Sequence, residues 1–386
     1  MLPKSFKRTY GGCKSMKIGI YTHYLDLFPQ SAPSLYQIKL IENLSKLKNI
    51  EIVLVHHIKN NLYIYKNFDE AIISKLPYFG ERDMNKLKLD VIHFNAIPCS
   101  WRIMVNKIKC RKVVTVHGDI WWVEPHLGYN KIPEFFKRLI EPRVVKYFDL
   151  VIAVSRSIEN TLIKYLKYPE ERIKIIYEGI DHYLFYPRTE EEIEIVKKKY
   201  KISNPYILHV SMFSKIKNPH ALFRTFKLVK EKLKNLALRN IKLIVVGSGW
   251  SEKYKNKLYT FGLDEIDVMF LGFVNQVDLP PLYSGAELYF HPSYHESFGF
   301  PNLEAMACGC PVVTSNKYAI PEIVGDAGIL HDPNDYTSFA ESIVEILTNE
   351  SLRKKLIRKG LKRAKIFSWE KTAEETYKVY KEVLDE

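Results

Sequence analysis

Short apolar runs alternate with amphipathic segments along most of this 386-residue chain. Several of the runs are apolar at every position, a pattern typical of parallel strands that are covered on both faces. In the first half, the predicted strands are residues 16–23, 51–57, 90–95, 113–117, 150–154 and 173–177. A charged, turn-rich stretch follows at 186–205, and the alternation then restarts with strands at 206–210, 241–246, 268–273, 287–291 and 311–314. The pattern predicts an α/β fold of two doubly wound, Rossmann-like parallel-sheet domains, with a ligand crevice at the carboxyl ends of the strands.

The length of the chain also favours two domains, because 386 residues are too many for one ordinary hydrophobic core. We place an N-terminal domain at 16–190 and a C-terminal domain at 203–368, and we expect the last helix, 369–386, to join the N-terminal domain. Residues 1–15 lack the apolar stretch of a secretory signal, so we interpret them as a disordered extension or as sequence upstream of a true start at Met16. No run of about eighteen uncharged apolar residues occurs, and we expect a cytoplasmic protein.

The formal net charge of +14 is unevenly distributed. Residues 351–367 contain eight Lys and Arg and no acidic residue, while Leu352, Leu356, Leu361 and Ala364 recur at helical spacing. This pattern predicts an amphipathic basic helix. Its simplest interpretation is a solvated surface helix, and the alternative is a patch for anionic lipid headgroups at the inner face of a membrane. Nucleic acid is disfavoured because no stacking aromatics interleave the charges.

Nothing in the sequence predicts a metal ion or another cofactor. The five cysteines (13, 99, 110, 308 and 310) lack metal-ligand spacing and are typical of buried residues in a reducing compartment. The chain has no Asp-x-Asp pair, and it lacks the G-x-S-x-G elbow of Ser-His-Asp hydrolases. We therefore expect any bound phosphate to be neutralised by lysine and by a helix N-terminus rather than by a metal.

Residues 291–314 carry the most specific chemistry. Glu296 and Glu304 lie eight positions apart, on either side of a change from loop to helix. Pro301 suits the first helical position, and Gly309 suits a left-handed helix end. The helix N-terminus would then point into the loop, where its unpaired N–H groups attract phosphate. With a carboxylate on each side to accept from hydroxyls, this segment predicts a ligand that has both phosphate and sugar hydroxyls.

The stretch from Pro292 to Val313, PSYHESFGFPNLEAMACGCPVV, resembles the E-x7-E signature of the group 1, family-four glycosyltransferases. Further segments resemble motifs of the same family: DLVIAVS (149–155), EGID (178–181), LIVVGSG (243–249), FLGFV (270–274) and PEIVGDAG (321–328). The C-terminal half matches more closely than the N-terminal half. The resemblance implies a GT-B fold, with two Rossmann-like domains facing a central cleft. It also implies a retaining hexosyltransferase that uses a UDP- or GDP-sugar.

Three catalytic residues follow from the resemblance. Glu296 would hydrogen-bond hydroxyls of the donor sugar, and His117, which ends the strand at 113–117, would contact the same sugar. Lys217 would stabilise the negative charge that grows on the departing diphosphate, without any proton transfer.

Four further residues are implied to bind the donor. Glu304 would accept hydrogen bonds from the ribose hydroxyls. Gly299, Phe300 and Pro301 would lay their backbone against the sugar and the diphosphate, and a Cβ at Gly299 would obstruct that approach.

Two departures from the family pattern concern the diphosphate. Met212 stands where the family usually has an arginine, and Lys215 could replace its charge but not its planar fork. The first loop, 28–34, lacks the Gly-Gly pair that is common there, and the hydroxyls of Ser31 or Ser34 could donate instead.

The acceptor is not readable from the sequence. Trp121 and Trp122 follow His117 and could form a stacking platform for an acceptor sugar or lipid, or pack in the core. Three other interpretations stay open: a sugar phosphorylase that uses inorganic phosphate, a non-catalytic binding protein of the same fold, and a basic membrane-surface module.

Overall fold

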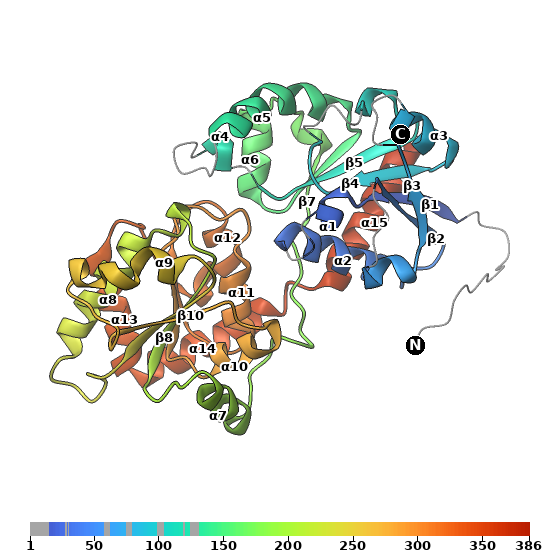
Figure 1. Ribbon diagram of the computed structural model, residues 1–386. Coiled ribbons are helices and arrows are strands. Elements are labelled where there is room, and N and C mark those ends of the chain that lie inside the picture. Colours follow the sequence, from blue (N-terminus) through green and yellow to red (C-terminus); the bar gives the residue numbers. More distant parts are fainter. Residues whose placement is uncertain are drawn as a thin grey trace. The chain divides into compact units, whose positions relative to one another are not determined.

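The computed structural model describes residues 15–27, 29, 31–57, 62–74, 79–98, 104–118, 120–123 and 131–386. These residues form two compact units that divide between Gly179 and Ile180, and residues 369–386 belong to the first unit (Figure 1). Each unit contains one parallel sheet with helices packed on it, which confirms the predicted fold class. The predicted N-terminal extension falls almost entirely on residues 1–14, outside the described residues.

The first unit is built on a seven-stranded sheet in the order β3-β2-β1-β4-β5-β6-β7. Its strands are β1 (Met16–Tyr21), β2 (Ile50–His56), β3 (Asp69–Ile72), β4 (Val91–Phe94), β5 (Arg111–Val116), β6 (Leu150–Ala153) and β7 (Ile173–Ile175). Its helices are α1 (His23–Leu27), α2 (Ala32–Leu44), α3 (Phe79–Lys86), α4 (Ile120–Val123), α5 (Lys131–Val144), α6 (Arg156–Lys164) and α15 (Trp369–Asp385). In this unit α15 packs on α2, which ties the end of the chain to its beginning (Figure 1).

The second unit is built on a six-stranded sheet in the order β10-β9-β8-β11-β12-β13. Its strands are β8 (Tyr206–Val210), β9 (Lys242–Val246), β10 (Val268–Gly272), β11 (Leu288–His291), β12 (Val312–Ser315) and β13 (Ile329–His331). Its helices are α7 (Glu190–Lys199), α8 (Pro219–Leu233), α9 (Trp250–Tyr254), α10 (Leu279–Ser284), α11 (Phe300–Ala307), α12 (Ile320–Val324), α13 (Tyr336–Thr348) and α14 (Glu350–Ala364). The strand order reverses between β8 and β11, and ligands of open α/β sheets bind at the carboxyl ends of strands at such a point.

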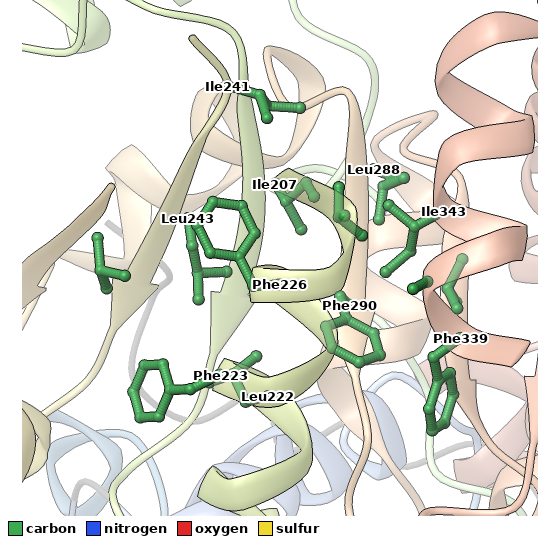
Figure 2. Packing of buried hydrophobic residues seen from close by; sticks show 14 of the residues in the cluster. Ile207, Leu222, Phe223, Phe226, Ile241, Leu243, Leu288, Phe290, Phe339 and Ile343 are labelled. Carbon is green, nitrogen blue, oxygen red and sulfur yellow. The ribbon is translucent and has the colours of Figure 1, made fainter. Parts of the chain in front are cut away.

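The core of the second unit holds this switch point rigid. Phe223 and Phe226 of α8 pack with Leu243 of β9, Phe290 of β11 and Phe339 of α13 (Figure 2). All five side chains are at most 1% exposed. Because such close packing leaves little room for rearrangement, the ends of β8 and β11 are fixed supports for the loops that follow them.

The structure adds two strands that the hydrophobic pattern did not predict, β3 and β13. Each is short and lies at a sheet edge with partly exposed positions. Within the described part of the chain, no helix is both long and apolar enough to cross a membrane.

Candidate functional site

Two loops meet where the strand order of the second unit reverses. One follows β8 and contains the short 3-10 helix η6 (Lys215–Lys217), and the other follows β11 and contains Glu296. The carbonyl oxygen of Ile216 accepts hydrogen bonds from the Tyr294 N–H at 2.8 Å and the Ser293 hydroxyl at 3.1 Å. These bonds join the two loops and bring Lys217 beside Glu296.

Glu296 is held as an anion by two donors on one oxygen. Its Oε1 accepts from Lys217 Nζ at 2.6 Å and from His291 Nε2 at 2.6 Å. Burial works against the charge, but the Lys217 ammonium and the His291 N–H keep the pKa of Glu296 below its ordinary value. None of the hydrogen bonds between described residues uses Oε2, so the second oxygen is left to accept from a ligand hydroxyl.

Glu304 has the opposite electrostatic setting. Its Oε2 accepts from the Tyr283 hydroxyl of α10 at 2.9 Å, and no cation is paired with it among the described residues. Burial raises the pKa of Glu304 to about 7, and the Tyr283 hydrogen bond offsets only part of that rise. The two glutamates of the motif therefore differ in charge near neutral pH.

The start of α11 lies between these carboxylates in the sequence. Gly299 precedes it with φ +99°, a left-handed conformation that L side chains rarely adopt. Phe300 and Pro301 are its first two residues, so Pro301 lies one position further along than predicted. Asn302 is fully buried, and neither atom of its side-chain amide has a hydrogen-bond partner in the part of the chain that the structure describes. Unpaired groups beside a helix N-terminus are suited to bind an anion.

The remaining candidates for binding the diphosphate, Met212 and Lys215, lie in the loop that follows the carboxyl end of β8. Met212 is 71% exposed and Lys215 is exposed, and none of the ion pairs between described residues includes Lys215. Gly247, in the turn after β9, has φ +125°, and a Cβ there would lie 1.9 Å from the Ser211 carbonyl oxygen. That turn therefore needs glycine for its packing against the loop that carries Met212.

His117 lies in the first unit, directly after β5. Its Nδ1 is 2.7 Å from Glu178 Oε1, and its Nε2 is 2.7 Å from Asn95 Oδ1. The Asn95 amide nitrogen donates to the Pro33 carbonyl oxygen at 2.7 Å, which orients the amide oxygen toward the histidine. Both ring nitrogens are therefore already engaged, and one of these bonds must break before His117 can bond a sugar hydroxyl. The predicted sugar contact stays a prediction.

The candidate acceptor tryptophans are only partly described. Trp122 is 8% exposed, and its indole N–H donates to Glu141 Oε2 at 2.7 Å. This arrangement fits core packing rather than a stacking platform. The side chain of Trp121 lies outside the described residues.

The described residues of the first loop, 29 and 31–34, offer no replacement for the missing Gly-Gly pair. Ser34 is buried, and Ser31 caps α2 by accepting from the Ser34 N–H. Phe28 and Gln30 lie outside the described residues.

The predicted basic helix is α14. It buries Leu356 and Ala364. Four of its seven basic residues bind acidic side chains or carbonyl oxygens, namely Arg353, Lys354, Lys359 and Arg363. The other basic residues of 351–367 are exposed and take part in none of the ion pairs between described residues, and they are Lys355, Arg358 and Lys362 of α14 and Lys365 directly after it. A lipid patch on this face stays a prediction.

Within the described ranges, no three His, Cys, Asp or Glu side chains form a group suited to a metal ion. Metal independence likewise stays a prediction.

Comparison with known proteins agrees with the E-x7-E motif. The profile of "Glycosyl transferases group 1" matches residues 190–363, and that of "Glycosyltransferase Family 4" matches residues 50–183. The chain belongs to the group 1 glycosyltransferases. Among its relatives, the O-antigen chain mannosyltransferase B of Escherichia coli is 34% identical over 234 residues, which cover 60% of each protein. The N-acetyl-alpha-D-glucosaminyl L-malate synthase of Bacillus anthracis is 29% identical over 309 residues, covering 77% of this chain and 74% of that enzyme.

A solved structure shows the same fold. Anabaena HepE, in complex with UDP and glucose, superposes with a TM-score of 0.71 at 20% identity and covers 94% of this group 1 glycosyltransferase and 99% of HepE.

Sequence reasoning missed three residues at this site: His291, Tyr283 and Asn302. His291 and Asn302 lie inside or beside the E-x7-E motif, but only the fold reveals that His291 bonds Glu296 and that the Asn302 amide has no partner among the residues described. Tyr283 is 21 positions from Glu304 and carries no local signal of that contact.

Proposed function

We propose that this glycosyltransferase moves a hexosyl unit from a nucleotide diphosphate sugar to an acceptor hydroxyl, with retention of the anomeric configuration. The observation that carries the proposal is the group at the switch point of the second unit. There a paired lysine and glutamate, a helix N-terminus and a second glutamate follow β8 and β11. The names of the mannosyltransferase relatives and the UDP and glucose bound by HepE support it.

The donor diphosphate would bind to the positively charged and N–H groups of this site. The N-terminus of α11, with the unpaired Asn302 amide beside it, would bind phosphate oxygens. Lys217 would leave Glu296 and stabilise the charge that develops on the leaving phosphate, and removing one such charge-stabilising group typically costs about 10²- to 10³-fold in rate. An ammonium group stabilises that charge by electrostatic attraction, so no proton needs to move at this point.

The hydroxyls of the donor would donate hydrogen bonds to the two carboxylates. Glu296 would accept from the sugar through Oε2, the oxygen that no described residue bonds. Glu304 would accept from the ribose and would be ionised in the complex, because hydroxyl donors stabilise the charged form of a carboxylate. The acceptor and the choice between a UDP- and a GDP-sugar stay open.

A thermal-shift screen tests the proposal directly. UDP-glucose, UDP-N-acetylglucosamine and GDP-mannose would be compared with inorganic phosphate, because a phosphorylase would respond to phosphate without a nucleotide. We expect one nucleotide sugar to raise the melting temperature, and Glu304→Ala to reduce that rise. A response to phosphate alone, or to none of the four compounds, would contradict the proposal.

A further inference from the structure

His291 is the last residue of β11, and its ring is fully buried. Its Nε2 lies 2.6 Å from Glu296 Oε1. A carboxylate oxygen can only accept, so Nε2 carries the hydrogen and donates it. The other ring nitrogen, Nδ1, is buried and has no hydrogen-bond partner among the described residues. Burial lowers the pKa of His291, although Glu296 opposes that effect. The ring is therefore neutral, with its single hydrogen on Nε2.

Stacking fixes the direction of this N–H. The His291 ring lies 5.2 Å from the His209 ring at an interplanar angle of 22°, and 5.7 Å from the Tyr289 ring at 17°. His209 is itself oriented, because its Nδ1 donates to the Phe290 carbonyl oxygen at 2.9 Å. A stacked ring with stacked neighbours cannot turn without disturbing the core, so Nε2–H stays aimed at Glu296.

The two donors on Glu296 Oε1 differ in what a diphosphate would do to them. The Lys217 ammonium is partly exposed at the end of a flexible stem, and a phosphate competes for it directly. The His291 ring carries no charge and is buried, so a bound phosphate does not attract it away from Glu296. When Lys217 moves to the donor, His291 is the group that still bonds Glu296 Oε1.

We propose that His291 is a positioning residue for Glu296, which keeps the carboxylate ionised and oriented toward the donor sugar after Lys217 moves to the diphosphate. The role of His291 in donor binding rests on the proposed function. The hydrogen bond from His291 to Glu296 is independent of that function.

The hydrogen bond can be tested without any substrate. Nitrogen-15 NMR of histidine-labelled protein distinguishes a ring protonated on Nε2 from one protonated on Nδ1. We expect His291 to carry its hydrogen on Nε2 at pH 7, both in the natural protein and in Lys217→Ala. A ring protonated on Nδ1, or one that changes tautomer when Lys217 is removed, would overturn the positioning role.

Its role in donor binding is tested by two matched substitutions. His291→Phe keeps a flat ring in the stack but removes the N–H, whereas His291→Gln places an amide N–H near the position of Nε2. The probe is whichever of UDP-glucose, UDP-N-acetylglucosamine and GDP-mannose the natural protein binds. We measure its Kd by calorimetry, and the kcat and KM for its hydrolysis. A hydrogen bond to a charged group predicts a loss of about 10- to 100-fold in kcat/KM for His291→Phe, and partial recovery in His291→Gln.

Repeating His291→Phe in a Glu296→Ala background separates positioning from folding. If His291 acts only through Glu296, the second substitution costs no further donor affinity. The proposal would be overturned if His291→Phe reduced donor affinity equally in the natural protein and in Glu296→Ala, or if it caused no loss in the natural protein. His331→Phe, at a histidine of β13 that bonds Ser342, controls for the general effect of this exchange. If the natural protein binds none of the three nucleotide sugars of the thermal-shift screen, the proposed function fails, and the NMR result alone decides the positioning of Glu296.

Discussion

Replacing Glu304 with glutamine is expected to stabilise the second unit above pH 7 while weakening donor binding. Burial raises the pKa of Glu304 to about 7 from an ordinary value of 4.5. Between these two pH values, the unfolded chain has lost the proton while the folded protein keeps it. Stability contributed by the protonated carboxyl is therefore complete below pH 4.5 and is lost as the pH rises through 7. Glutamine does not titrate, and its amide oxygen can still accept from Tyr283.

The size of the effect follows from the difference between the two pKa values. Each pKa unit corresponds to about 1.4 kcal/mol. As the pH rises from 4.5 to 8, the unfolding free energy of Glu304→Gln should therefore increase relative to that of the natural protein by at most about 3 kcal/mol. Partial exposure of the carboxylate reduces this upper bound. Glu296→Gln is the matched control and should have the opposite sign, because Lys217 and His291 stabilise the charged form of Glu296.

Urea unfolding at several pH values measures this difference. Trp250 is the only tryptophan between residues 180 and 368 and is fully buried, so a variant that keeps it as the sole tryptophan reports on the second unit alone. Parallel pH profiles for the natural protein and Glu304→Gln would contradict the prediction, because they would mean that Glu304 ionises as it does in the unfolded chain. Calorimetry in buffers of different ionisation enthalpy adds a binding test, since donor binding at pH 6 should release about one proton.

Three further substitutions have defined outcomes. Lys217→Ala should lower kcat by about 10²- to 10³-fold in a donor-hydrolysis assay, and a change in KM alone would contradict a role for Lys217 at the leaving phosphate. Met212→Arg places an arginine at an exposed position. It should tighten the Kd for the donor by about tenfold or more in calorimetry, and an unchanged Kd would mean that this position does not reach the diphosphate. Gly299→Ala forces a Cβ into a left-handed conformation with φ +99°, so it should lower the unfolding free energy by about 1–2 kcal/mol; equal stability in urea would show that the loop relaxes freely.

The hydrophobic pattern was sufficient for most of the fold because parallel strands covered on both faces are apolar at nearly every position. It predicted β8 at its observed bounds and β9 to within one residue. It missed β3 because that strand begins with Asp69 and Glu70 and lies at a sheet edge, where pairing with β2 rather than burial defines it. The pattern within one segment carries no information about such pairing.

The candidate site was likewise predictable from the sequence only in part. Local spacing was enough to single out Glu296 and Glu304, because the motif lies within one loop and one helix. Their difference in charge could not be predicted, since it depends on Lys217, which is 79 positions from Glu296, and on Tyr283 of another helix. Burial and distant partners set a carboxylate's pKa, and both appear only once the chain is folded.

The most direct test of the account is a crystal structure with the nucleoside diphosphate of whichever donor binds. We expect both ribose hydroxyls within about 3 Å of the Glu304 carboxylate, the diphosphate at the start of α11, and Lys217 moved from Glu296 to a phosphate oxygen. A ribose bound elsewhere, with Glu304 still bonded only to Tyr283 and Lys217 still paired with Glu296, would contradict it.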